Sequence, residues 1–447
     1  MEKNLTEGSV LKTVIYFSLP YLLSYFLQTL YGMADLFITG QFYGVDTITA
    51  VSNGSQIMHM MTVIIVGLAM GTTVTIGHSV GAKCMEQAEK IIGNTITLFM
   101  GIAVAFTVIL VVLVKPIVVL IAAPQEAVAG TSIYLLICFI GIPFITAYNI
   151  ISSIFRGLGD SKSPMYFIGI ACVMNIALDY LFMGAFHMGA AGAALGTVCA
   201  QTFSVLVALW VIRRRKTGIS LKKSDFKIER AVIGQVLKIG IPVALQDGFI
   251  QVAFMIITVI ANSRGVSDAA AVGVVEKVIS ALFIVPSSML ATVSALSAQN
   301  LGAGKEKRAT DTLHYATVIT TIYGMIVAVL IQFIAENVVG IFTSDTTVVT
   351  MGSAYIRSYI WDCIFAGIHF SFSGYFAACG KSYIGFLHNI ISITFVRVPG
   401  SYLASKYFTD TLYPMGLAAP AGSLVSVAIC VTAFILLKRK SRVAQTA

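Results

Sequence analysis

The chain has 447 residues, of which 57% are hydrophobic and only 11% are charged, and its mean hydropathy is +0.89. Soluble domains carry roughly 25% charged residues, so these values exclude a water-soluble globular protein. The formal net charge is +9. The positions of the basic residues, described below, explain this charge by membrane topology, and no nucleic-acid partner is expected.

Apolar stretches dominate the chain, and a helix needs ~20 such residues to cross a bilayer. Backbone groups in lipid must be satisfied internally, so we predict an all-α integral membrane protein. The residues Met1–Leu5 show no signal-peptide pattern, and the first span is expected to serve as the insertion signal. Twelve transmembrane helices are predicted, near residues 14–39, 47–76, 91–115, 128–152, 163–184, 190–212, 236–261, 270–298, 312–335, 347–376, 383–404 and 414–437.

Most lysines and arginines lie in the loops between these spans or near the ends of the chain. If successive loops lie on opposite sides of the membrane, 23 of the 29 lysines and arginines fall on the side of the N-terminus. Only Lys115, Arg264 and Lys406 fall on the other side, and the remaining three lie within spans. The positive-inside rule then predicts that both termini are cytoplasmic, in a multi-pass protein of the cell (plasma or inner) membrane. Binding of lipid headgroups by the basic clusters is compatible with this reading.

The chain repeats itself. A shift of 221 residues carries Phe155 and Gly159 onto Phe376 and Gly380, and Pro20 has a counterpart in Pro242. We predict a six-helix lobe at 1–216, a cytoplasmic linker at 217–235 and a second six-helix lobe at 236–447. Six spans is an even number, so the lobes should share one orientation and be related by a pseudo-two-fold axis along the membrane normal. Such a duplication favours a transporter that works by alternating access.

The sequence lacks the motifs that several other functions require. The seven cysteines have no C-x-x-C spacing, which argues against a disulfide framework or a metal site. The sequence has no phosphate loop and no recognisable catalytic constellation, so an ATP-driven pump or an enzyme is not expected. A channel is a further alternative, although the doubled architecture suits alternation better than a fixed pore. Coupling to an ion gradient is the preferred interpretation, without any cofactor.

Two polar turns carry a family resemblance. The run Gln299–Gly304 followed by Arg308, together with the turn Phe155–Asp160, resembles the multidrug and toxic compound extrusion (MATE) family, in its DinF-like branch. The resemblance covers essentially the whole chain. It implies two six-helix lobes around a central cavity, and export of organic, often cationic, drugs and toxins in exchange for H⁺ or Na⁺. The expected partners are small organic molecules and membrane lipid, and a monomer is expected.

Acidic residues within apolar spans are the strongest functional pointers, because an ionised carboxylate in lipid is costly and normally faces a partner or a wet cavity. Asp35 lies late in the first span and Asp179 in the fifth, where Asn175 shares its helical face. Burial disfavours a charged carboxylate and a bound cation favours it, so such a group can exchange a proton for a cation. Alternatively, Asp35 is an interfacial residue and Asp179 a structural hydrogen-bond acceptor.

The family resemblance extends this pair. It implies that Asp35 and Asp179 bind the coupling ion, with possible Na⁺ there as the only metal. It also implies that uncharged polar groups coordinate or hydrogen-bond around them; in this chain these are Asn175, Tyr134, Asn149 and Thr197.

Pro20 precedes Asp35 by 15 residues, about 22 Å along a straight helix. Proline removes a backbone hydrogen bond and kinks a helix. We predict a hinge at Pro20 that bends when the Asp35 site changes occupancy, and a static kink is the alternative.

The second half lacks an equivalent pattern. The NorM-like branch has a glutamate in span seven and an aspartate in span ten, where this chain has Ile250 or Gln251 and Ile368 or His369. Three residues are candidates for the substrate cavity: Asp247, Glu276 and His59. Interhelical charge pairing is the simpler explanation for the acidic ones, and a packed structural role would explain His59. The roles of Lys277, Arg357, Asp362 and Arg397 stay open.

The repeat is asymmetric at the predicted site. Shifting Asp35 by 222 lands on Ile257, and shifting Asp179 and Asn175 by 221 lands on Gly400 and Val396. The first half is therefore predicted to hold the ion. A lipid-linked oligosaccharide flippase of the same superfamily is the alternative function, although such proteins usually add two spans and a cavity richer in arginine and lysine.

Overall fold

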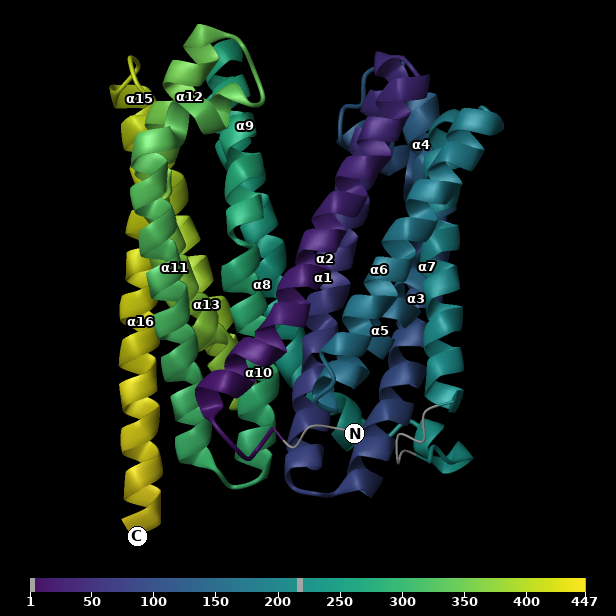
Figure 1. Cartoon of the computed structure of the whole chain (residues 1–447), viewed down its shortest axis with the longest axis vertical. Helices are drawn as coiled ribbons and strands as arrows, with labels where there is room; N and C mark the ends of the chain where they lie inside the picture. The colour runs from purple at the N-terminus through teal and green to yellow at the C-terminus, as the bar shows by residue number, and fades with distance from the viewer. Residues whose placement is uncertain (1–4, 215–219, 447) are drawn as a thin grey trace. The chain divides into compact units, whose positions relative to one another are not determined.

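A computed structural model describes residues 5–214 and 220–446 of the chain (Figure 1). The predicted topology determinants Lys3, Arg215 and Lys216 and the start of the predicted linker, 217–219, lie outside the described residues. The described part consists of helices and short connections.

The helices of the first half run from α1 to α7, with a π-helical turn η1 directly after α6 and a 3₁₀ turn η2 in the connection that follows α7. Their bounds are α1 Val10–Phe42, α2 Val45–Gly81, α3 Met85–Leu120, α4 Val128–Ile140, α5 Ile142–Gly157, α6 Lys162–Asp179, η1 Tyr180–Ala185, α7 Gly189–Arg214 and η2 Lys223–Phe226.

The second half follows the same general order with nine helices in its described residues, because α9 and α10 are separate and α15 follows a second π-helical turn, η3, after α14. The bounds are α8 Arg230–Asn262, α9 Val266–Leu282, α10 Ile284–Gly302, α11 Glu306–Gly340, α12 Thr346–Tyr359, α13 Asp362–Ala378, α14 Ser382–Ser392, η3 Ile393–Arg397, α15 Val398–Tyr407 and α16 Tyr413–Thr446.

Each of the twelve predicted spans coincides with a helix or a consecutive group of helices. Within the described residues, nine helices are long and apolar enough to cross a membrane, or ten if α4 and α5, bent by 52°, form one span. The remaining two predicted spans correspond to α12 with α13 and to α14, η3 and α15. These two are broken into shorter pieces by the bend after Tyr359 and by the π-turn.

The helices group into two compact units. The first consists mainly of Leu19–Ala244 and also includes Gly302–Gly304. The second contains Thr6–Ser18, Leu245–Leu301 and everything from Lys305 onward. Two of the boundaries that fall inside a helix lie close to a proline, since α1 changes unit between Ser18 and Leu19 and α8 changes unit shortly after Pro242. A third lies at the last residue of α10.

Small residues bring helices of the first unit close together. A Cβ added at Gly71 of α2 would overlap the carbonyl oxygen of Val236 in α8, and one at Gly240 would overlap that of Leu68. These glycines therefore allow direct backbone contact between α2 and the start of α8. Helices in lipid associate through such close packing because no hydrophobic force drives them together.

The connection between the repeats is anchored to α3 by hydrogen bonds. Asn94 Nδ2 donates to the carbonyl oxygen of Asp225 at 3.1 Å, and the amide nitrogen of Glu229 donates to Asn94 Oδ1 at 2.7 Å. Thr97 Oγ1 donates to the carbonyl oxygen of Phe226 at 3.0 Å. The described part of this connection thus belongs to the first unit.

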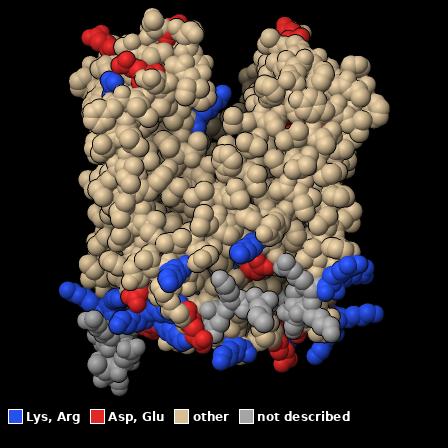
Figure 2. Space-filling view, in the orientation of Figure 1, with Lys and Arg blue, Asp and Glu red and all other residues tan. Residues whose placement is uncertain are grey.

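Lysine and arginine side chains lie mainly at one end of the helices of each unit, whereas acidic side chains lie at both ends (Figure 2). The surface between the helix ends is almost free of charge in this view (Figure 2). Val112 of α3, Phe333 of α11 and Leu424 of α16 are examples of exposed large apolar side chains within these helices. A belt of this kind fits contact with lipid.

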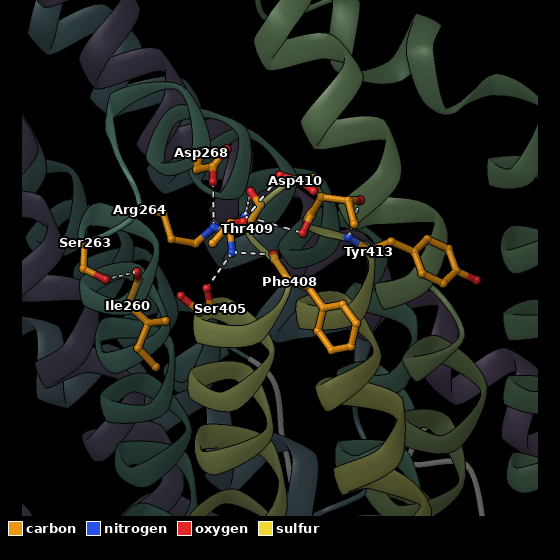
Figure 3. Close-up of polar contacts among 10 residues, drawn as sticks. Ile260, Ser263, Arg264, Asp268, Ser405, Phe408, Thr409, Asp410 and Tyr413 are labelled. Carbon is orange, nitrogen blue, oxygen red and sulfur yellow. Dashed lines mark hydrogen bonds and ion pairs between the residues drawn. The ribbon is translucent and has the colours of Figure 1, made fainter.

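Arg264, in the loop between α8 and α9, holds the loop between α15 and α16 (Figure 3). Its Nε donates to Asp268 Oδ2 at 2.6 Å, in the first turn of α9. Its two Nη atoms donate to four backbone carbonyl oxygens, those of Ser405, Phe408, Thr409 and Thr411, at 2.9 to 3.5 Å. One guanidinium thereby satisfies carbonyls at the end of α15 that have no partner within a helix. We call this group the Arg264 clasp.

The position of Pro20 at a unit boundary motivates a first prediction. In Pro20→Ala the helix regains a backbone hydrogen bond, which favours a straight α1 by about 3 kcal/mol. If α1 bends during transport, we expect efflux to fall to roughly a tenth of the wild-type rate. Drug efflux from cells at matched expression measures this. Pro116→Ala, inside α3, is the control, and unchanged efflux in Pro20→Ala would establish a static kink.

Candidate ion-binding site

Two carboxylates of the first unit lie buried beside each other. Asp35 of α1 is 2% exposed and Asp179, the last residue of α6, is fully buried. The two side chains interact, and Asn175, one turn before Asp179 on α6, contacts both. The i, i+4 spacing that the sequence showed places Asn175 and Asp179 on the same face, and the fold brings that face to α1.

Two further helices, α7 and α4, contribute to the group. Thr197 of α7 donates its hydroxyl to Asp35 Oδ2 at 3.4 Å. The same hydroxyl interacts with Tyr31, one turn before Asp35, and with Tyr134 of α4. Carboxylate, amide, hydroxyl and phenol oxygens from four helices therefore surround one point.

Many of these polar atoms have unused hydrogen-bonding capacity. Among the described residues, no hydrogen bond of good geometry reaches Asp35 Oδ1, either oxygen of Asp179 or the side-chain amide of Asn175, although these groups adjoin each other. Neither carboxylate has a described lysine or arginine among its partners. Two negative charges ~4 Å apart repel by about 4 kcal/mol at an effective dielectric of ~20. A cation or a proton placed between them would remove that repulsion.

The end of α1 is tied to the π-turn beside the site. Tyr43 donates its hydroxyl to the carbonyl oxygen of Met183 at 3.0 Å and accepts a hydrogen bond from the amide of Gly189 at 2.9 Å. Thr39, one turn after Asp35, donates to the carbonyl oxygen of Asp35 at 2.6 Å. π-Helical turns are rare and frequently occur at functional sites. These contacts hold α1 and α6 in register around the two carboxylates.

Two stretches of the chain match the model of the MatE family, residues 20–181 and 242–403. Together they cover well over half of the sequence. The chain belongs to the MatE family. The two matched segments are the two halves of the internal repeat, each beginning at the proline of α1 or α8.

Curated relatives of this MatE chain are named for drug resistance. It is 29% identical over 413 residues to the "Probable multidrug resistance protein YpnP" of Bacillus subtilis, covering 92% of each chain. It is 23% identical over 377 residues to the "Multidrug export protein MepA" of Staphylococcus aureus, covering 84% of this chain and 83% of that protein. MatE proteins are transporters; of these relatives, one is named for multidrug resistance and the other for multidrug export.

Solved MATE structures share the fold over almost the whole chain. The outward-facing conformation of a multidrug resistance MATE family transporter matches with a TM-score of 0.91 at 20% identity, covering 100% of this chain and 99% of that one. A MOP superfamily transporter from Pyrococcus furiosus, described as having a binding pocket of reverse polarity, matches with a TM-score of 0.89 at 19% identity, covering 98% of this chain and 97% of that one. Both likenesses establish the two-lobed helical fold.

The other predicted site residues of this MatE chain have no contact with the group among the interactions of the described residues. Asn149 of α5 is buried, and its Nδ2 donates to the carbonyl oxygen of Ile145 in the same helix at 2.8 Å. His59 is exposed on α2, and Asp247 is half-buried on α8. Glu276, on α9 of the second unit, has a polar environment of its own that is described below.

Two residues of the site are absent from the sequence prediction. Tyr31 precedes Asp35 by four residues, so helical spacing could have indicated it. Gly196 of α7 has no side chain to signal a role, yet a Cβ there would overlap Asp179 Oδ1 and lie 3.6 Å from Asn175 Nδ2. The absence of a side chain at Gly196 leaves space for the Asp179 carboxylate, and only the packing of α7 on α6 reveals this role.

Gly196 gives a second prediction. In Gly196→Ala the new methyl group must displace the Asp179 carboxylate, at an overpacking cost of about 1–3 kcal/mol. We expect the affinity for the coupling ion to fall by roughly tenfold, because a displaced carboxylate cannot close the site. The dependence of efflux on ion concentration measures the change. Gly101→Ala in α3, where an added Cβ meets nothing within 4 Å, is the matched control, and an equal response of both variants would contradict the prediction.

Proposed function

We propose that this MatE protein is a cation-coupled antiporter that exports organic, mainly cationic, drugs and toxins by alternating access. The observation that supports it most is the pair of buried, mutually adjacent carboxylates, Asp35 and Asp179, without a basic partner among the described residues. The names of the curated relatives support the substrate class.

The mechanism follows from electrostatics. Two adjacent carboxylates are costly to bury while both are ionised. Binding H⁺ or Na⁺ offsets that cost and stabilises the arrangement in which α1, α6 and α7 close around the ion. Loss of the ion stabilises a different arrangement of α1. An ion and a substrate that favour different states of one protein are coupled thermodynamically, typically by 1–3 kcal/mol.

The oxygen set suits either ion. Sodium needs several oxygen ligands, which Asp35, Asp179, Asn175 and Thr197 can supply, and a proton needs only one carboxylate. Proteoliposomes with the purified chain and a fluorescent organic cation distinguish them. Substrate movement driven by an imposed pH gradient at equal sodium indicates H⁺, and movement driven by a sodium gradient at equal pH indicates Na⁺. Failure of both gradients to drive movement would contradict the proposal.

A further inference from the structure

The second unit contains its own buried ionic group, which the proposed ion site does not use. Glu276 of α9, Asp362 of α13 and Arg397 of η3 interact within the helix bundle. We call these three residues the Arg397 cluster. Asp362 is 1% exposed and Arg397 9% exposed, so both lie away from water and from lipid.

Arg397 is held in place on several sides. Its Nη2 donates to the hydroxyl of Tyr359, and its guanidinium carbon lies 4.9 Å from the ring centroid of Phe254 and 5.5 Å from that of Tyr359. Stacking on aromatic faces stabilises a cation. A guanidinium also keeps its charge at every physiological pH. Arg397 is therefore a permanent positive charge at a defined point in the unit.

The charges of the cluster do not balance. Two carboxylates face one guanidinium, which leaves one uncompensated negative charge when both acids are ionised. Among the described residues, Glu276 Oε1, both oxygens of Asp362 and Arg397 Nε have no hydrogen bond of good geometry. An uncompensated buried charge is strongly unfavourable. One of the carboxylates needs a further positive charge, and the unused oxygens show where it can bind.

We propose that Glu276 is a second, exchangeable proton-binding site of the transporter, with Arg397 as the resident counter-charge of Asp362. A proton from the aqueous phase adds to the Glu276 carboxylate to form the neutral acid, and it leaves by the reverse step. The proposed function places the coupling ion in the first unit. This proposal concerns the second unit and depends on different residues.

The two carboxylates differ in exposure, and this difference favours Glu276 over Asp362 as the group that exchanges a proton. Glu276 is half-buried, whereas Asp362 is sealed and also interacts with the Ser423 hydroxyl of α16. The described hydrogen-bond partner of Glu276 is Thr258 of α8, whose Oγ1 lies 3.4 Å from Glu276 Oε2. A hydroxyl can donate to a carboxylate or accept from a carboxylic acid, so Thr258 can serve both protonation states.

The neighbouring groups favour a proton over a larger cation. The ionisable residues that face the cluster are Tyr355 and Tyr359 from α12 and, beside Arg397, His369 from α13. From α8 the cluster meets the uncharged Phe254 and Thr258. The fixed guanidinium opposes any added positive charge beside Glu276, but a proton bonds to the carboxylate itself and needs neither further oxygen ligands nor space.

With a shift of 222 residues, Arg397 is the counterpart in the repeat of the Asn175 amide. The two family segments begin 222 residues apart, at 20 and 242, and end 222 apart, at 181 and 403. That shift pairs Arg397 with Asn175, whereas the shift of 221 seen in the preceding turn pairs Asn175 with Val396. With the longer shift, the second unit carries a tethered cation where the first unit carries an amide beside two carboxylates. The two units then differ in charge at equivalent positions, which fits a mobile cation in one and a proton in the other.

Infrared difference spectroscopy of the purified, full-length protein during a pH titration tests the proposal directly, because protonated carboxyl groups have their own C=O band. We expect Glu276→Gln to lose one titrating buried carboxyl band. Arg397→Gln should gain one, because Asp362 then lacks its counter-charge and takes up a proton. Glu336→Gln is the matched control, since Glu336 of α11 is a surface residue of the same unit, 66% exposed.

Transport adds a second readout. In proteoliposomes we expect Glu276→Gln to lower substrate movement driven by a pH gradient by roughly tenfold, with Glu336→Gln unchanged. A Glu276→Gln spectrum identical to wild type would overturn the proposal, as would a band removed by sodium at constant pH, which would assign a metal cation to the site. The spectra do not depend on transport, so they remain decisive even if no gradient drives efflux and the proposed function fails. If Arg397→Gln does not fold, Arg397→Lys keeps the charge, and its spectrum should match that of the wild type.

Discussion

Asp35→Asn is expected to reduce gradient-driven efflux to about a tenth of the wild-type rate or less. Asparagine keeps the shape of the side chain and can still accept from the Thr197 hydroxyl, but it cannot be ionised. The site then loses half of its negative charge, and the ion no longer offsets any repulsion with Asp179. Coupling free energies of 1–3 kcal/mol correspond to 5- to 150-fold effects, which sets the expected size. Efflux of a fluorescent organic cation under an imposed gradient measures it.

The control and the second carboxylate sharpen this test. Asp46→Asn makes the same chemical change at an exposed position in the first turn of α2, in the same unit, and should leave efflux unchanged. Asp179→Asn should match Asp35→Asn, and the double variant should be hardly worse than either, because the two groups act together on one ion. Wild-type efflux in Asp35→Asn would show that the residue plays only a structural or interfacial role.

Arg264→Ala is expected to destabilise the second unit by roughly 3–5 kcal/mol, the range for removing one partner of a buried ion pair. The Arg264 and Asp268 side chains are 6% and 13% exposed, so the remaining carboxylate is poorly solvated. Four loop carbonyls lose their donor at the same time (Figure 3). The thermal unfolding of detergent-purified protein, followed by the loss of monodisperse protein, measures the effect.

The second unit also provides the matched control for the clasp. Arg357 pairs with Glu336 at 3.3 Å, but these side chains are 35% and 66% exposed, and exposed ion pairs contribute ~0–1 kcal/mol. Arg357→Ala should therefore shift unfolding little. Arg264→Lys should shift unfolding by an amount between those of Arg264→Ala and Arg357→Ala. An ammonium group cannot reproduce the forked guanidinium, which reaches Asp268 and four carbonyls together. Equal shifts in Arg264→Ala and Arg357→Ala would show that water replaces the clasp at little cost.

Much of the architecture could be predicted from the sequence because lipid imposes simple rules. A span must be apolar, long enough and hydrogen-bonded within itself, and each of these is a local property of the chain. The twelve predicted stretches are therefore all helical, and the repeated turns identified the family that the MatE match then confirmed. The breaks within α12–α13 and α14–α15 were not anticipated, because bends and π-turns depend on how neighbouring helices pack.

The site divides in the same way. By itself the sequence determined which residues are unusual, since Asp35 and Asp179 are conspicuous in apolar helices and Asn175 shares a face with Asp179. Only the tertiary structure decided which of them meet. It brought Thr197, Tyr134 and Tyr31 to the two carboxylates and left Asn149 bonded within its own helix. It also showed that Gly196 makes room for Asp179 and that Arg397 interacts with both Glu276 and Asp362. Helical spacing specifies a face, but the partner of that face depends on contacts between segments far apart in the chain.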